Sequence, residues 1–287
     1  MDSLRVVGVH GIWQGNTNSE KLAADWRGAL TRGMSRHFGA DIPIPALTVR
    51  HYAEEFRRRK GTLGPGADVF DDQPIDADEE AFIAEALTEV VPQAPAAAPQ
   101  QVGTLGMGLP YLPLPVTRLM AGIDATCGRH TGKRLLYTVR QVYKYLYKGD
   151  IGARIRDVVR EDLTQPGTRV TIAHSLGSVV VYDLFHRGEL DPASCDVSTF
   201  ITCGSPLGWP TVRRAVNGLE HPLSVPGGVE WVNVYSLGDL VALGQGLAGV
   251  ALKVRDEEVS NGTAPHEVTR YLDKRPVSES VVRALAI

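Results

Sequence analysis

The stretch "TRVTIAHSLGSVVVYDLF", residues 168–185, decides the fold prediction for this chain. A run of β-branched and small residues, typical of a buried strand, leads directly into His174 and Ser175. Gly177 follows, and the apolar residues behind it recur with helical spacing. The pattern predicts a strand that turns sharply into a helix, with Ser175 at the corner. Two interpretations of this serine are open, a nucleophile and an N-cap of the helix.

Strands and helices are expected to alternate on both sides of this stretch. Helices are expected at residues 151–163, 176–185 and 209–219, and strands at 169–173, 197–206 and 227–239. Nearer the N-terminus, residues 4–9 and 44–53 are expected strands. The helix between them is predicted from one apolar face, formed by Leu22, Trp26, Ala29, Leu30 and Met34. Such alternation predicts an α/β fold with a mostly parallel, doubly wound sheet, which carries its site at the carboxyl ends of the strands.

Composition excludes several classes of protein. The 287 residues are 43% hydrophobic and 22% charged, as in ordinary globular proteins. A net charge of −3 gives no reason to expect a nucleic-acid partner. The three cysteines have no metal-ligand spacing, and their odd number argues against a disulfide framework. The N-terminus is too polar for a signal peptide and no apolar run is long enough for a membrane span, so we expect a cytoplasmic protein.

Residues 57–148 interrupt the alternation. Residues 90–117 carry no charge and contain six prolines and three glycines, so we expect neither a regular helix nor a central strand through them. Helices are expected before them, at 78–91, and after them, from Lys133. We interpret 57–148 as an insertion within a single domain spanning 1–287. Its apolar residues, 103–116 above all, are expected to form a lid or pocket wall; a linker, a packed segment or a partner surface are the alternatives.

Five motifs resemble the lipases and esterases of the α/β-hydrolase superfamily. They are "VHGIWQG", "AHSLGS", "CGSPLG", "YSLGDLVA" and "PHEVTRYL", and they occur in the order that this fold requires. The resemblance covers residues 4–56 and 149–287. It implies an α/β-hydrolase fold that is N-terminally shortened, without the two antiparallel strands of the full fold, and that carries an inserted lid-like segment. Ala173 departs from the glycine that usually precedes the serine in this motif.

The resemblance also implies roles for individual residues. Ser175 would be the nucleophile and His266 the base, because the family places its histidine after the acid. Asp239 matches the acid, with Asp256 and Glu257 as alternatives that also precede His266, while Asp183 is expected to face solvent. His10 and His174 are expected to support the site without reacting.

The oxyanion hole and the substrate pocket are expected beside Ser175. The backbone N–H groups of Leu176 and Ile12 would form the oxyanion hole, with Trp13 as the alternative to Ile12. Possible pocket residues are Trp13, Leu105, Met107, Leu109 and Tyr111. The resemblance implies no metal and no organic cofactor, and the oligomeric state stays open.

These expectations together predict a serine hydrolase that cleaves a carboxylic ester through an acyl-enzyme. The substrate would be a small-molecule or lipid-like ester with an apolar acyl or alcohol group. One alternative is an amide or thioester hydrolase with the same three residues. The other is a catalytically idle hydrolase-like domain that binds a partner.

Overall fold

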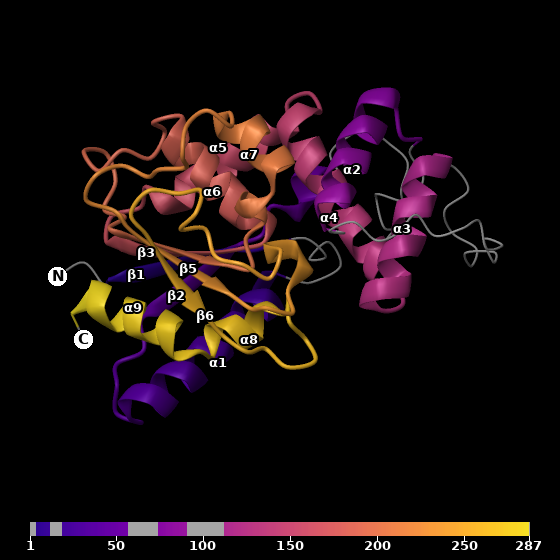
Figure 1. Ribbon diagram of the computed structural model, residues 1–287. Coiled ribbons are helices and arrows are strands. Elements are labelled where there is room, and N and C mark those ends of the chain that lie inside the picture. The colour runs from indigo at the N-terminus through magenta and orange to yellow at the C-terminus, as the bar shows by residue number, and fades with distance from the viewer. Residues whose placement is uncertain (1–3, 12–18, 57–73, 91–111, 287) are drawn as a thin grey trace.

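The computed structural model describes residues 4–11, 19–56, 74–90 and 112–286. Within them, a six-stranded sheet lies between helices on both of its faces (Figure 1). Each pair of neighbouring strands is parallel, in the order β2-β1-β3-β4-β5-β6. The predicted α/β class, with a parallel sheet covered by helices, is therefore confirmed.

The secondary structure follows the expected alternation. The strands are β1 (Arg5–Val9), β2 (Ala46–Arg50), β3 (Thr168–His174), β4 (Thr199–Cys203), β5 (Glu230–Tyr235) and β6 (Val254–Glu258). The α-helices are α1 (Ser19–Phe38), α2 (Ala77–Val90), α3 (Leu114–Cys127), α4 (Thr131–Tyr147), α5 (Ile151–Leu163), α6 (Leu176–His186), α7 (Pro210–Asn217), α8 (Val268–Leu272) and α9 (Arg275–Leu285). Three 3₁₀ turns are η1 (Ala53–Phe56), η2 (Pro206–Gly208) and η3 (Leu240–Ala242).

The strand order changes direction at the centre of the sheet. From β1 the chain moves outward to β2 and then returns to place β3 on the other side of β1. In a parallel sheet, such a reversal opens a crevice at the carboxyl ends of the two strands, where ligands bind. The residues that follow these two ends are His10-Gly11 and Ser175.

Two apolar layers hold the helices on the sheet. On one face, Trp26, Leu30 and Met34 of α1 join residues of α8 and α9. These α1 residues recur every four positions, so they form one buried stripe, as predicted. On the other face, residues of α5, α6 and α7 form the larger cluster. Figure 1 shows α1, α8 and α9 below the sheet and α5, α6 and α7 above it.

Helices α2, α3 and α4 gather at one side of the sheet (Figure 1) and share the larger apolar cluster. The prediction that no helix enters residues 90–117 is wrong at its end, because α3 begins at Leu114. Pro115 lies in the first turn of α3, where a backbone N–H has no helical acceptor and proline is therefore tolerated. Residues 91–111 lie outside the described residues, and so do Leu105, Met107, Leu109 and Tyr111.

The sequence patterns missed the C-terminal elements. Strand β6 has the sequence VRDEE, without an apolar face, and it lies at the edge of the sheet, where one side of the strand is unpaired. Helices α8 and α9 follow it and, together with α1, complete the layer that covers this face of the sheet. These elements matter for the site, because His266 precedes α8.

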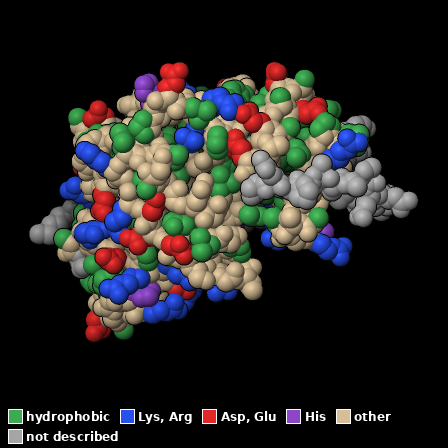
Figure 2. All heavy atoms as spheres, viewed as in Figure 1, with side chains coloured by type: hydrophobic (Ala, Val, Ile, Leu, Met, Phe, Trp, Pro, Cys, Tyr) green, Lys and Arg blue, Asp and Glu red, His purple; other side chains and the backbone are tan. Residues whose placement is uncertain are grey.

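The described surface carries charges of both signs. On the face shown in Figure 2, Lys and Arg side chains are interspersed with Asp and Glu. Among the described residues, no helix is both long and apolar enough to cross a membrane.

Candidate active site

Ser175 stands at the corner between β3 and α6 in a conformation that few residues adopt. Its φ is 53° and its ψ is −126°, and its backbone N–H donates to the carbonyl oxygen of Cys203 at 3.1 Å. A non-glycine residue at positive φ costs about 1–3 kcal/mol and persists where the surroundings enforce it. The Ser175 side chain makes no capping hydrogen bond to α6. The interpretation of Ser175 as an ordinary N-cap therefore lacks its defining contact.

Gly177 explains how the helix can start so close to the sheet. A Cβ at this position would lie 2.3 Å from the carbonyl oxygen of Val9 and 2.6 Å from that of His10. Gly11 approaches from the neighbouring strand end, where an added Cβ would lie 2.6 Å from the Cβ of Ser175. The two glycines allow the corner of β3–α6 and the end of β1 to meet at Ser175.

His266 lies between Ser175 and Asp239 and contacts both. Its Nε2 is 3.1 Å from the Ser175 Oγ, and its Nδ1 is 2.9 Å from the Asp239 Oδ2. A carboxylate can only accept, so Nδ1 carries the proton and donates it to Asp239. In the neutral ring Nε2 is then free to accept the hydroxyl proton of Ser175. The structure brings the three predicted residues together in one hydrogen-bonded chain.

Asp239 is fully buried and every oxygen of its carboxylate is bonded. Oδ1 accepts from the backbone N–H of Val241 at 3.0 Å. Oδ2 accepts from His266 and also from the Tyr271 hydroxyl, which is 2.7 Å away. Burial would raise the pKa of Asp239, but His266 and the Tyr271 hydrogen bond outweigh it and hold the pKa below its usual value. Asp239 therefore stays ionised inside the protein.

The other candidate acids are engaged elsewhere. Asp256 accepts from the Asn233 amide and from the backbone N–H groups of Leu247 and Ala248, at 2.7–2.9 Å. Glu257 pairs with Arg255.

Asp183, which was expected to face solvent, is instead 3% exposed, because α4 and α5 cover that side of α6. Its carboxylate accepts hydrogen bonds from Tyr145, Arg156 and Arg187.

Two buried histidines brace the strand ends. His10 donates from Nδ1 to the Gly11 carbonyl at 2.5 Å and accepts at Nε2 from the backbone N–H of Tyr52 at 3.1 Å. The Tyr52 ring stacks on it, and the Tyr52 hydroxyl donates to the His10 carbonyl at 2.5 Å. His174 donates from Nε2 to the His266 carbonyl at 2.9 Å. Burial lowers the pKa of both histidines to about 3, so each is neutral. Their role as supports of the site stays a prediction.

Only part of the expected oxyanion hole lies within the described residues. Leu176 is the first residue of α6 and is fully buried, and its backbone N–H belongs to the first turn, whose N–H groups have no acceptor within the helix. Ile12 and Trp13 lie outside the described residues. No group of three or more His, Cys, Asp or Glu that could hold a metal occurs in the part of the chain that the structure describes.

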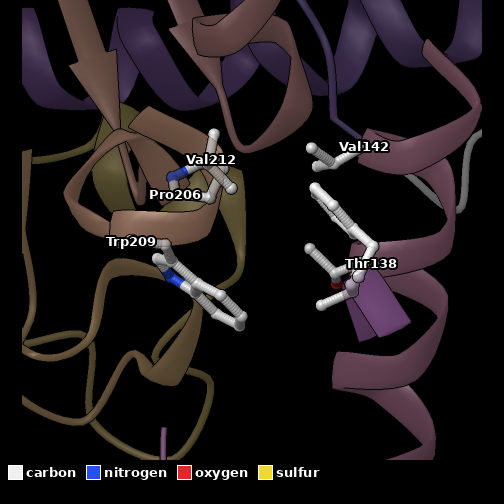
Figure 3. Close-up of a pocket in the computed structure, with 7 residues that line it drawn as sticks. Thr138, Val142, Pro206, Trp209 and Val212 are labelled. Carbon is white, nitrogen blue, oxygen red and sulfur yellow. The ribbon is translucent and has the colours of Figure 1, made fainter. Parts of the chain in front are cut away.

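An apolar crevice lies between α4 and the segment that follows β4. Figure 3 shows Thr138 and Val142 of α4 on one side, and Pro206, Trp209 and Val212 on the other; Phe82 and Val139 complete the lining. Trp209 donates from its indole to the Val241 carbonyl at 2.6 Å, and the N–H of Val241 donates to Asp239. Two hydrogen bonds through the Val241 backbone thus link the Trp209 indole to Asp239.

Comparison of the chain with family models, curated proteins and solved structures finds no match. The candidate site therefore stands on its own contacts. Sequence reasoning missed Tyr271 and Tyr52, although Tyr271 lies within the quoted motif "PHEVTRYL", because only the folded chain brings a tyrosine hydroxyl to Asp239 or to His10.

Proposed function

We propose that this protein is a serine hydrolase of the α/β-hydrolase type that cleaves a carboxylic ester through an acyl-enzyme. The observation that carries the proposal is the hydrogen-bonded chain from Ser175 through His266 to Asp239, with Ser175 held at a φ of 53°. A serine hydroxyl is a weak nucleophile until an adjacent base accepts its proton. His266 stands at the distance and in the tautomer that this transfer requires.

In the proposed reaction, the Ser175 Oγ attacks the ester carbonyl carbon while its proton passes to the His266 Nε2. The carbonyl π electrons move onto oxygen, and the resulting oxyanion would be bound by the Leu176 N–H and, on the family pattern, by that of Ile12. When the tetrahedral intermediate collapses, the bond to the alcohol breaks and His266 returns its proton to the leaving oxygen. Asp239 stabilises the imidazolium formed between these steps.

Water completes the cycle by the same route. His266 accepts a proton from water as the water oxygen attacks the acyl carbon. The second intermediate then collapses to the carboxylic acid as its bond to Ser175 breaks, and His266 returns the proton to the Ser175 Oγ. The residues assigned here hold and move the protons of every step. No metal or organic cofactor enters this scheme.

An apolar acyl or alcohol group is the second part of the proposal. It is supported by the apolar residues of 103–116, which are expected to form a lid or pocket wall. The crevice that Pro206, Trp209 and Val142 line has a volume of about 10 Å³, which is too small for an acyl chain. An amide or thioester would use the same residues, so the leaving group is decided by assay. The cytoplasmic location stays a prediction.

Turnover of p-nitrophenyl esters tests the assignment. Ser175→Ala should abolish hydrolysis and leave the fold intact, because the hydroxyl supplies chemistry and little packing. Asp239→Asn should reduce turnover on the order of 10⁴-fold, since an amide favours the wrong histidine tautomer. Asp256→Asn is the matched control and should retain most activity, because Asp256 contacts Asn233 and backbone N–H groups away from His266. The reverse result for the two aspartates would require reassigning the acid, and undiminished hydrolysis by Ser175→Ala would overturn the proposal.

A further inference from the structure

Asp239 receives a hydrogen bond that the three-residue scheme does not use. The Tyr271 hydroxyl is 2.7 Å from the Asp239 Oδ2, the same oxygen that accepts from His266. Tyr271 lies in α8, five residues after His266, and its side chain is fully buried. One carboxylate oxygen is therefore shared between an imidazole and a phenol.

The direction of the Tyr271 proton is fixed by its surroundings. The backbone N–H of Ser236 donates to the Tyr271 oxygen, so the single hydroxyl proton is directed to Asp239. Burial, followed by the charge of Asp239, raises the pKa of Tyr271 far above its usual value. The phenol thus stays protonated and donates to Asp239.

Within the described part of the chain, two further titratable groups lie next to this pair. Asp239 and His174 are the ionisable groups that contact His266, and His174 is neutral, with its pKa lowered to about 3 mainly by burial. Cys203 lies near Tyr271, and burial raises the pKa of its thiol, so it is neutral as well. Among these groups, Tyr271 alone donates a proton in direct competition with His266.

We propose that Tyr271 is a positioning residue that fixes Asp239 and reduces the basicity of the Asp239–His266 pair. The hydrogen bond from Tyr271 compensates part of the negative charge on the Asp239 Oδ2. The carboxylate therefore stabilises the imidazolium form of His266 less strongly. Without this hydrogen bond the pair would hold its proton more tightly, so Tyr271 favours the neutral imidazole that accepts the Ser175 proton. This inference rests on the proposed function, since it assigns His266 as the base.

The test follows the rate at which a fluorophosphonate modifies Ser175 as a function of pH. In Tyr271→Phe the deprotonated pair loses a hydrogen bond, so it should protonate more readily. The midpoint of the acid limb should rise by about one pH unit relative to wild type. Incorporation of 3-fluorotyrosine at position 271 keeps the shape and makes the phenol a stronger donor, so the midpoint should fall. This second variant decides the question even if Tyr271→Phe fails to fold.

Tyr182→Phe is the matched control. Tyr182 is also fully buried, and its hydroxyl also accepts from a backbone N–H, that of Ser224, while donating to a side-chain oxygen, that of Asn217. Removing this hydroxyl should cost similar stability and leave the midpoint unchanged. Suppose that wild type is labelled at Ser175 but neither Tyr271 variant changes the pH midpoint of labelling. That result would overturn this inference and leave the proposed function standing. Absence of Ser175 labelling in wild type would overturn the proposed function, and this inference with it.

Discussion

The Nε2 of His174 donates a hydrogen bond to the backbone carbonyl of His266 at 2.9 Å, and the two rings lie 4.6 Å apart. His174 directly precedes Ser175 in the chain. The backbone of the proposed base is therefore tied to the residue next to the proposed nucleophile. This tie sets the separation of Ser175 and His266 independently of the hydrogen bond between their side chains.

Loss of this tie should lower turnover without abolishing it. His174→Leu removes the donor to the His266 carbonyl, so His266 samples positions away from Ser175, and ester turnover should fall about tenfold. His174→Gln retains an N–H donor near the position of Nε2 and should recover part of the loss. Steady-state kinetics of the two variants at neutral pH checks this. Equal activity of His174→Leu and wild type would show that the tie is dispensable.

Activity should require glycine at position 204 because a side chain there would collide with Asp239, in addition to the strain of its positive φ. Its φ is +56°, and a Cβ there would lie 2.6 Å from the Asp239 Oδ2 and 3.1 Å from the His266 Nδ1. Gly204→Ala should therefore displace the carboxylate and reduce turnover by at least about 100-fold. Gly188, at φ +69° with nothing within 4 Å of its Cβ position, is the matched control.

Both alanine variants place a non-glycine residue at positive φ, but only Gly204→Ala brings a Cβ against the side chains of the site. Gly188→Ala should lose about 1 kcal/mol of stability and no activity. Denaturation curves measured beside the kinetics separate the two effects. If Gly204→Ala keeps wild-type turnover, the position of Asp239 next to Gly204 is unimportant for the reaction.

The buried histidines should make the fold sensitive to acid. His10 and His174 have their pKa lowered from 6.5 to about 3, first by burial. As the pH falls below about 6.5, these two histidines bind protons in the unfolded chain but remain neutral in the folded chain. The free energy of unfolding therefore decreases as the pH is lowered. Each histidine should reduce the free energy of unfolding by about 1.4 kcal/mol per pH unit in that window.

Urea denaturation between about pH 7 and pH 5 measures this slope. His10→Asn should make it shallower, because one of the two buried histidines is gone. His37→Asn, at the exposed end of α1, is the control and should leave the slope as in wild type. An identical slope in His10→Asn and wild type would show that His10 does not contribute to the loss of stability in acid.

Catalytic efficiency should rise with the length of the apolar ester group. Each methylene that enters an apolar site adds about 0.8 kcal/mol, which corresponds to about a fourfold gain in kcat/KM until the site is filled. A series of p-nitrophenyl esters of graded chain length measures the profile. A profile that is flat or falls from the shortest ester would contradict the apolar substrate.

The sequence predicted the centre of this protein better than its edges. Ser175 at a strand-to-helix corner is a local pattern, whereas the roles of Asp239 and His266 were implied by the family resemblance; the structure brings these three residues into contact. Strand β6 was missed because VRDEE shows no apolar alternation, and an edge strand needs none on its open side.

The contacts that tune the site are tertiary and have no local pattern. Tyr271 reaches Asp239, and Tyr52 stacks on His10, only after distant segments have packed. The prolines of residues 90–117 predict that no helix enters this segment, whereas Pro115 occupies the first turn of α3, where the missing N–H has no helical acceptor to lose. Periodicity and composition do not specify such positions.

Covalent labelling of Ser175 tests the central claim most directly. A fluorophosphonate incubated with the folded wild-type protein at neutral pH should add one group per chain, and peptide mass spectrometry should map it to Ser175. Ser175→Ala should remain unmodified, and His266→Ala should react far more slowly because no base accepts the serine proton. A wild-type protein that stays unmodified, or carries the adduct on Ser205 or Ser236, would contradict the account.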